Sequence, residues 1–298
     1  MTLPIAILCC VVTMVGWGSW ANTQKLAGKE KWPFELFYWD YAIGVFLFSL
    51  LFATIGEGFR VVGAFAVTAL ISGAIFNLAN ILLVVAIDAA GMSVAFPVGI
   101  GLALVIGTFE SYLEAPKGNP SLLFPGVALI VFAMIMSAMA RQTVGKNRLR
   151  GLIFSIVAGC IMGLFYPQLM RAIGPAKLTP YVALVFFGAG VLLSNVIVNS
   201  VFMKAGGVGY ADYFRGSAKL HLIGILGGSI WMVALCLNVI ASGVAGPAIS
   251  YALGQGATLV AAIWGVFVWR EKGAISYTTL MFIGYATGLI LIGAATLR

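Results

Sequence analysis

The chain has 298 residues, of which 62% are hydrophobic and 9% are charged, and its mean hydropathy is +1.07. Soluble domains carry roughly 25% charged residues, so this composition excludes a soluble globular protein. The formal net charge of +8 comes from basic residues dispersed along the chain. That dispersal is typical of the positive-inside bias of membrane proteins rather than of nucleic-acid binding.

The same composition favours a bundle of helices in lipid. The 37 glycines suit close packing between helices, and the sequence lacks the alternating ten-residue segments of a membrane β-barrel. The four cysteines lie inside apolar runs, and His221 is the one histidine. We therefore expect packed thiols rather than disulfides, and neither a metal site nor a cofactor.

Ten apolar segments follow one another along the chain, each near the roughly 20 residues that cross a bilayer. No basic segment precedes the first one, so we expect it to be retained rather than cleaved. The connections are too short for a soluble domain. The expected spans are residues 3–24, 34–56, 62–87, 91–113, 121–140, 150–170, 180–203, 218–241, 245–268 and 275–296. The predicted fold is an all-α integral membrane protein of about ten transmembrane helices.

Lysine and arginine gather in alternate connections, which predicts the orientation. Most of the 17 basic residues fall on one side, and the positive-inside rule makes that side cytoplasmic. The other side has Arg60, Lys117, Arg171, Lys177 and Arg298. We therefore expect a multi-pass protein of the cell (inner) membrane with both termini on the non-cytoplasmic side.

The chain shows internal similarity between its two halves. One constant shift places Gly73 on Gly228 and carries a stripe of small residues in the fourth span onto a stripe in the ninth. A second shift places Lys25 on Arg171. Five spans is an odd number, so the second half would enter the membrane in the opposite sense, as in many transporters. This predicts two inverted five-helix halves, residues 1–145 and 146–298; chance similarity between apolar helices is the alternative.

Two acidic residues inside spans are candidates for binding a coupling cation, H⁺ or Na⁺. An ionisable group in lipid costs several kcal/mol and is a functional candidate by default. Asp40 lies in the second span near its cytoplasmic end, and Glu110 lies near the outer end of the fourth. The alternatives are an interfacial Asp40 held by aromatic residues or by Lys29 or Lys31, and a Glu110 that snorkels to the surface.

Amides and aromatic side chains inside the spans are the candidates for binding a solute. Amides beside aromatic walls suit an uncharged solute rich in hydrogen-bonding groups, such as a sugar or a cyclic amide. Alternatively, these groups bridge helices for about 0.6 kcal/mol each. The expected substrate contacts are Trp17, Trp20, Asn77, Asn80, Tyr166, Gln168, Trp231 and Gln255. Pro97 and Pro167 fall inside spans, where each removes a backbone donor; they indicate discontinuous helices, with proline kinks that form no site as the alternative.

Several short motifs in order resemble the ureide permease group of the drug/metabolite transporter superfamily, close to its glucose- and rhamnose-type sugar permeases. The resemblance covers most of the chain. Its motifs are Phe37-Tyr38-Trp39-Asp40-Tyr41, Asn77-Leu78-Ala79, Ile106-Gly107-Thr108, Leu123-Phe124-Pro125-Gly126-Val127-Ala128, Phe165-Tyr166-Pro167, and Trp264-Gly265 with Glu271.

The resemblance implies a ten-helix inverted-repeat carrier driven by a cation gradient, usually of protons. It implies substrates such as allantoin and related cyclic amides, uracil or monosaccharides. The long cytoplasmic insert of plant-type members is missing, because only Arg141 to Arg150 connects the halves.

The function we expect is a permease (symporter) that moves a small polar solute by alternating access. Its partners would be that solute, membrane lipid and a coupling cation, with a homodimer left open and no nucleic acid. Export of drugs or metabolites is the alternative, although the first span has no embedded acid of the kind that cationic-drug exporters use. An intramembrane enzyme would need a catalytic constellation, and the sequence shows no nucleophile–base pair, paired aspartates or metal triad.

Overall fold

The computed structural model describes residues 1–28, 32–56, 62–140, 147–270 and 273–297. Within these residues ten helical segments are long and apolar enough to cross a membrane, as expected, and their ends lie within about one helical turn of the predicted ones. The elements are α1 (Leu3–Ser19), α2 (Ala21–Ala27), α3 (Phe34–Ile55), α4 (Gly63–Ala90), α5 (Met92–Glu114), α6 (Pro120–Ala140), α7 (Arg148–Arg171), α8 (Pro180–Gly206), α9 (Tyr210–Phe214), α10 (Ala218–Ala245), α11 (Pro247–Gly254), α12 (Ala257–Ile263), the π-helix η1 (Trp264–Val268) and α13 (Ile275–Ala294). The chain is an all-α integral membrane protein.

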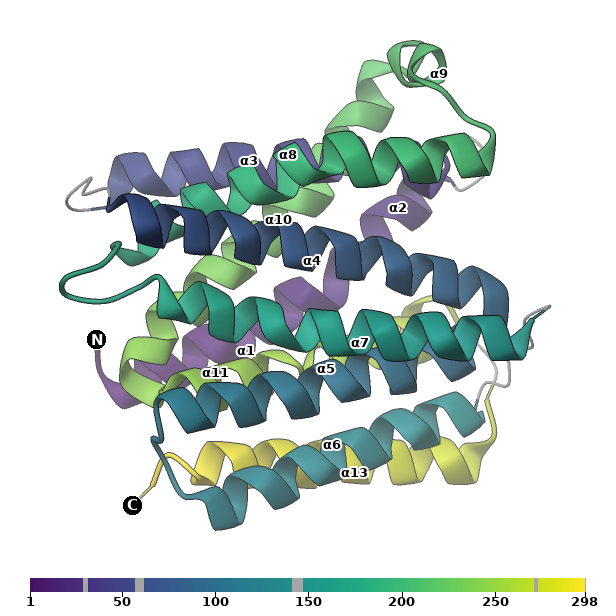
Figure 1. The fold of residues 1–298 in the computed structure, drawn as a ribbon. Helices are drawn as coiled ribbons and strands as arrows, with labels where there is room; N and C mark the ends of the chain where they lie inside the picture. The colour runs from purple at the N-terminus through teal and green to yellow at the C-terminus, as the bar shows by residue number, and fades with distance from the viewer. Residues whose placement is uncertain (29–31, 57–61, 141–146, 271–272, 298) are drawn as a thin grey trace.

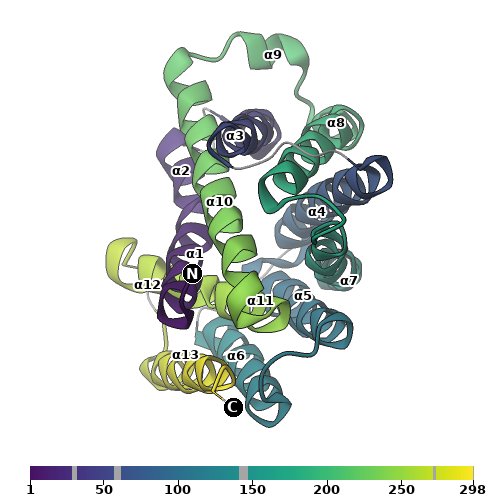
Figure 2. The same cartoon turned by 90° about the vertical axis from the view of Figure 1, so that its left-hand side faces the viewer.

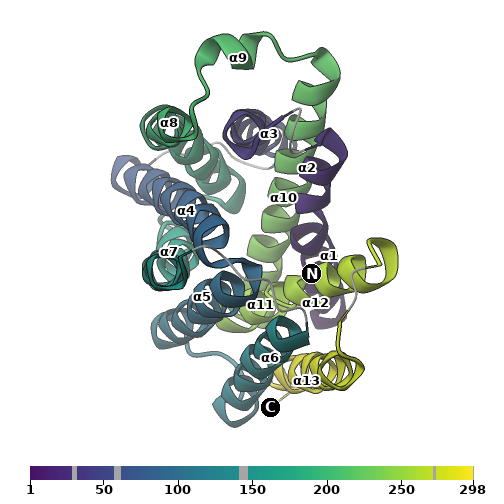
Figure 3. The ribbon, with the colours of Figure 1, turned by 90° about the vertical axis from the view of Figure 1, so that its right-hand side faces the viewer.

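The spans lie side by side, with both chain ends at the same end of the bundle (Figure 1). We call this the terminal end. We call the other the basic end, because Lys25 at the end of α2, Lys204 at the end of α8 and Arg215 after α9 lie there. Seen along the spans, α6 packs on α13 at one edge, and α3 and α8 lie at the other edge beneath α9 (Figures 2 and 3). Between them, α7 packs against α4 and α5, and α10 packs against α1 and α3.

The surface of the bundle is largely apolar, whereas several amides are buried inside it, as a lipid solvent favours. On α8, the large side chains of Leu193, Ile197 and Val201 recur every four residues and are more than half exposed. On the same helix Asn195 and Asn199 are fully buried. This pattern is the reverse of a soluble helix, and it places the polar groups where a solute could meet them.

Two glycines let helices cross at backbone contact. A Cβ atom at Gly73 on α4 would lie 2.0 Å from the carbonyl oxygen of Phe187 on α8. A Cβ atom at Gly228 on α10 would likewise lie 2.0 Å from the carbonyl oxygen of Tyr41 on α3. Any side chain at either position forces the two backbones apart, so both crossings depend on glycine.

The ninth span is interrupted at Gln255 and Gly256, a position without a proline. Helix α11 ends at Gly254, and α12 begins only after Gln255 and Gly256. Two glycines around one residue weaken a helix at that point, because glycine is a poor helix former. The expectation that Pro97 and Pro167 open their spans is wrong, since α5 and α7 continue through both prolines.

Candidate functional site

The middle of the bundle is filled by aromatic rings around Trp231. The ring of Trp17 stacks on Trp231 with centroids 5.8 Å apart, and Phe76 and Phe187 approach it at 4.3 and 5.8 Å. We call these four residues the aromatic core. Two of the predicted substrate contacts, Trp17 and Trp231, therefore lie together, and they come from the first and the eighth span.

Trp20 continues this aromatic surface toward the basic end. Its ring lies 4.7 Å from that of Tyr41, which in turn stacks on Tyr38 at 5.1 Å. The hydroxyl of Tyr41 is buried and has no hydrogen-bond partner in the described part of the chain. Trp20 thus borders the aromatic core without stacking on Trp231 itself.

Besides the Tyr41 hydroxyl, four buried polar atoms near the aromatic core make no hydrogen bond of normal geometry with the described residues, although Ser242 lies near the Tyr166 hydroxyl and Cys10 near that of Ser250. They are the indole nitrogen of Trp17, the hydroxyls of Tyr166 and Ser250, and the amide oxygen of Asn238. An unpaired buried polar atom costs about 1–3 kcal/mol. We call this set the unpaired cluster; it is the arrangement expected of groups that bind a solute.

The unpaired cluster lies beside the break in the ninth span. A Cβ atom at Gly254 would meet the Trp17 ring at 2.8 Å and the Asn238 amide nitrogen at 2.9 Å. That nitrogen donates to the carbonyl oxygen of Ser250 at 2.8 Å. Gln255, another predicted contact, is partly buried at the break itself. The break therefore brings α1, α10 and α11 to one point.

A cavity of about 410 Å³ opens at the terminal end. It is lined by Met170, Ile173, Pro180, Tyr181, Val239, Ile240, Ser242, Gly243 and Pro247. Three of the helices that line it each carry a member of the unpaired cluster about one turn deeper in the bundle. Met170 is followed inward by Tyr166, Ser242 by Asn238, and Pro247 by Ser250. The cavity and the unpaired cluster are thus about one helical turn apart on these three helices, and no member of the cluster lines the cavity.

Two other predicted contacts bridge helices. The amide of Asn77 donates to the Ser194 hydroxyl at 3.0 Å, and the amide of Asn80 donates to the Tyr38 hydroxyl at 3.1 Å. These bonds join α4 to α8 and α4 to α3. Both bonds fit the helix-bridging alternative, but the amide oxygen of Asn77 is buried and has no partner among the described residues, so Asn77 also keeps an atom that could meet a solute. Asn195, which the solute-binding set omits, is fully buried and neither of its side-chain atoms has a partner among the described residues.

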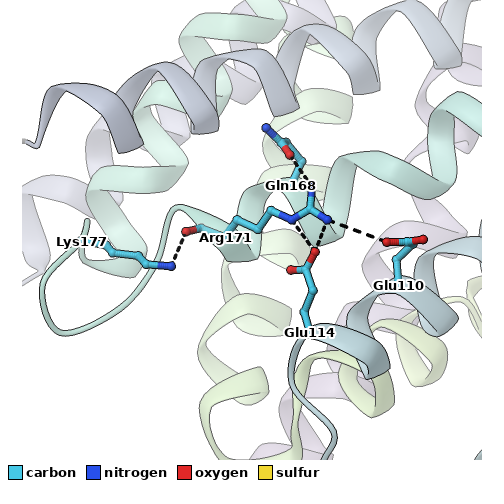
Figure 4. A network of polar contacts seen from close by, with 5 residues as sticks. All are labelled: Glu110, Glu114, Gln168, Arg171 and Lys177. Atoms are coloured by element: carbon cyan, nitrogen blue, oxygen red, sulfur yellow. Dashed lines mark hydrogen bonds and ion pairs between the residues drawn. The ribbon is translucent and has the colours of Figure 1, made fainter.

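Gln168 and Glu110 meet at Arg171, where α7 ends (Figure 4). Arg171 donates to the Gln168 amide oxygen at 3.0 Å, pairs with Glu110 at 3.8 Å, and contacts Glu114. The side chains of Arg171 and Glu110 are 50% and 36% exposed. We call these four residues the Arg171 cluster. Its exposure fits the alternative in which Glu110 reaches the membrane surface.

Asp40 has a different environment, near the basic end of α3. Its carboxylate accepts hydrogen bonds from the Trp32 indole at 3.0 Å and from the Tyr213 hydroxyl at 2.7 Å. The Nδ1 atom of His221 lies 2.8 Å from the same oxygen as Tyr213. The Asp40 side chain is 1% exposed and that of His221 is 26% exposed. We call these four residues the Asp40 network.

The Asp40 network joins parts of the chain that are distant in sequence. Tyr213 lies in α9, outside the spans. Burial raises the pKa of its hydroxyl well above its usual value, and the hydrogen bond to Asp40 raises it further. The hydroxyl therefore stays protonated and donates. A Cβ atom at Gly224 would meet that of Asp40 at 2.4 Å, so α10 packs directly on the carboxylate. Lys29 and Lys31, considered from the sequence as partners, lie outside the described residues.

The sequence analysis missed the pairing of His221 with Asp40. The available signals were that His221 is the one histidine and that it lies one turn from Gly224 at the start of a span. The unpaired cluster also includes Asn238 and Ser250, which were not among the predicted contacts. Both lie near the Gly254–Gly256 break, which was the signal that could have found them.

The comparisons with known proteins agree with a transporter. A family model described as "Sugar transport protein" matches residues 8–298. No curated protein matches the sequence. A solved structure titled only "Crystal structure of protein" is similar at 16% identity and a TM-score of 0.67, with 98% of each chain covered. That likeness concerns the fold alone.

Proposed function

Because the chain belongs to the sugar transport protein family, we propose that it is a secondary permease that moves a monosaccharide or a similar small polar solute across the cell membrane by alternating access, with H⁺ as the coupling cation. The observation that carries this proposal is the unpaired cluster behind the cavity at the terminal end. Narrower membership in the ureide permease branch stays a prediction, as do cyclic amides as substrates.

The chemistry of the unpaired cluster suits a sugar. The Trp17 indole donates, the Asn238 amide oxygen accepts, and the hydroxyls of Tyr166 and Ser250 do both. A sugar hydroxyl also donates and accepts, so it can pair with each type. Aromatic faces nearby pack against the apolar face of a sugar ring, and the Tyr166 ring stacks on Tyr251 at 4.9 Å. Solute binding would pair the buried groups and offset their desolvation.

Relations between contacts support a division into two inverted halves, residues 1–145 and 146–298. The shifts that relate the halves place Gly73 on Gly228 and Tyr41 on Phe187. They therefore turn the Gly73–Phe187 crossing into the Gly228–Tyr41 crossing. A second pair behaves alike. A Cβ atom at Gly190 would lie 2.0 Å from the Leu70 carbonyl oxygen, and one at Gly44 would lie 2.2 Å from that of Ile225. In carriers built this way, one half moves against the other around a fixed site.

Asp40 is the proposed site of coupling. A buried carboxylate can take up a proton and become neutral, which lowers the cost of its burial. Glu110 is the second candidate, although its exposure and its pairing with Arg171 make it less suited. Both termini would lie outside and the basic end would face the cytoplasm, so the cavity would open to the exterior.

The test is uptake into proteoliposomes of labelled hexoses, rhamnose, ribose, allantoin, uracil and xanthine under an imposed proton or sodium gradient. The proposal predicts saturable, proton-dependent uptake of a sugar. Tyr166→Phe and Ser250→Ala should raise the KM for that sugar by about tenfold, because each removes about 1.4 kcal/mol of hydrogen bonding.

Two matched variants are the controls. Tyr277→Phe changes a tyrosine of α13, and Ser229→Ala removes a hydroxyl that bonds to its own helix at the Ile225 carbonyl oxygen. Both should leave the KM unchanged. If none of the solutes is taken up, or if the control variants weaken uptake as much as Tyr166→Phe and Ser250→Ala, the proposed permease function or its site is wrong.

A further inference from the structure

The Asp40 carboxylate is sealed from water yet has a path to it. The Asp40 side chain is 1% exposed, and in the described part of the chain its polar partners are Trp32, Tyr213 and His221. Trp32 can only donate. Tyr213 stays protonated because burial and Asp40 raise the pKa of its hydroxyl. Among these partners, only the imidazole has one ring nitrogen that can accept a proton and another that can donate one.

The imidazole is placed between Asp40 and the basic end. Its Nδ1 atom lies 2.8 Å from the carboxylate oxygen. Its Nε2 atom points toward the connection between α9 and α10, since a Cβ atom at Gly216 would lie 2.8 Å from it. The His221 side chain is 26% exposed, so one nitrogen faces the buried acid while the ring reaches the solvent boundary.

In the described part of the chain, no second side chain that could relay a proton contacts the Asp40 carboxylate. Asp212 and Arg215, near α9, pair with each other at 3.9 Å. Lys25 in α2, which packs against α10, lies 4.6 Å from the centroid of the Trp269 ring. The other charged groups are Glu35 at the start of α3, Lys204 at the end of α8 and Lys219 at the start of α10. None of these contacts Asp40, whose partners are the three residues of its network.

We propose that His221 is the proton relay between Asp40 and the aqueous phase at the basic end. The proposal rests on the proposed function, because it needs Asp40 to carry the coupling proton. In the release step the O–H bond of neutral Asp40 breaks and an N–H bond forms at Nδ1 of the neutral imidazole. The N–H bond at Nε2 then breaks and its proton passes to water. The net change is one proton moved from Asp40 to the basic end, with a carboxylate and a neutral imidazole left behind.

Trp32 and Tyr213 act as positioning residues in this scheme. Both donate to the carboxylate and favour its ionised form after the proton has left. The ring of Trp32 also meets that of His221 edge-on at 5.0 Å, and that of Tyr213 meets it at 4.7 Å. These contacts hold the imidazole with Nδ1 toward Asp40.

The first test uses His221→Gln, whose side-chain amide can still donate to Asp40 but cannot carry a proton. Sugar uptake driven by an inside-negative membrane potential, at equal pH on both sides, should slow by about tenfold or more. Counterflow exchange of sugar, which needs no net proton movement, should persist. Potential-driven uptake at the wild-type rate in this variant would overturn the relay.

The second test is chemical rescue. Uptake by His221→Ala under the same potential should rise severalfold when imidazole is added on both sides, because free imidazole can occupy the space of the missing ring. Since His221 is the one histidine of the chain, rescue reports on this position. Asp40→Asn is the control and should gain nothing. If imidazole restores nothing while counterflow by His221→Ala persists, the relay is wrong.

The two proposals fail in different ways. If sugar uptake by the unmodified protein ignores proton gradients and membrane potential, the coupling proposed above fails, and the relay fails with it. If that uptake is proton-coupled and His221→Gln takes up sugar under the membrane potential at the wild-type rate, only the relay fails.

Discussion

The two polar constellations near the helix ends show how differently charge can be handled in one bundle. The Arg171 cluster combines a guanidinium with two carboxylates, and these side chains are 50%, 36% and 28% exposed. Exposed ion pairs of this type contribute about 0–1 kcal/mol. The Asp40 network buries one carboxylate almost completely and surrounds it with a histidine and two neutral donors. Burial of this kind is costly, which is why we assign coupling to Asp40 and not to Glu110.

The residues that correspond to the Arg171 cluster under the internal repeat sharpen this contrast. The shifts that relate the halves place Asn22, Lys25 and Trp269 where the Arg171 cluster has Gln168, Arg171 and Glu114. The Trp269 indole donates to the Asn22 amide oxygen at 2.7 Å, and the Lys25 ammonium lies 4.6 Å from the Trp269 ring. A basic residue at a helix end is thus held by carboxylates in one half and by an aromatic ring in the other. Both sets tie neighbouring helices together, which fits a structural role.

The largest predicted effect separates the two acids. Asp40→Asn should abolish gradient-driven sugar accumulation while leaving counterflow exchange, because the amide cannot take up the coupling proton. Glu110→Gln should leave accumulation within about twofold of the unmodified protein, because its carboxylate pairs with Arg171 at the surface. The measurement is steady-state accumulation in proteoliposomes. Loss of accumulation in Glu110→Gln alone would reverse the assignment.

The next effect concerns the glycine crossings. Gly228→Leu should prevent a stable fold, because its side chain would have to displace the Tyr41 carbonyl 2.0 Å away. Gly243→Leu is the matched control, since a Cβ atom there meets nothing within 4 Å. The yield of monodisperse protein in detergent measures the difference. Equal yields for the two variants would contradict the tight crossing of α10 and α3.

A smaller effect is expected at Tyr213. Tyr213→Phe should lower stability by about 1–3 kcal/mol, because the buried carboxylate loses a donor. The pKa of this hydroxyl is raised in the folded state, so its contribution is present below the ordinary tyrosine pKa of about 10 and is lost as pH rises above it. The difference in Tm between the two proteins should be constant from pH 6 to about 9 and shrink above about 10. A difference that grows with pH would contradict the hydrogen bond.

The smallest effect is expected at the Arg171 cluster. Glu114→Gln should change stability by less than about 1 kcal/mol, and the difference should fall further at high salt. Thermal unfolding at low and high ionic strength measures it. A loss of several kcal/mol that salt does not reduce would mean that the cluster is energetically comparable to the Asp40 network.

The fold was predictable because each span is one local apolar segment, and its length is set by the bilayer. Asp40 could also be singled out, since a carboxylate inside a span is informative by itself. His221 could not be paired with it, because 181 positions separate the two residues and only the packing of α10 on α3 brings them together.

The solute-binding residues were partly predictable for a similar reason. The two tryptophans of the aromatic core are recognisable as aromatic residues in mid-span, whereas Asn77 and Gln168 look alike in sequence and bond differently in the structure. Asn77 bridges two helices inside the bundle, and Gln168 bonds to Arg171 at its surface. Which amide keeps an unpaired atom depends on which neighbours the tertiary packing supplies, and the sequence does not specify those neighbours.

The most direct test of sugar–proton coupling through Asp40 is the proton movement that accompanies sugar entry. Proteoliposomes with an internal pH indicator and no imposed ion gradient would receive external sugar, with the membrane potential clamped at zero. The unmodified protein should acidify the interior in proportion to sugar uptake, and Asp40→Asn, in vesicles preloaded with unlabelled sugar, should exchange sugar without acidification. Sugar entry without acidification in the unmodified protein, or unchanged acidification in Asp40→Asn, would contradict coupling through Asp40.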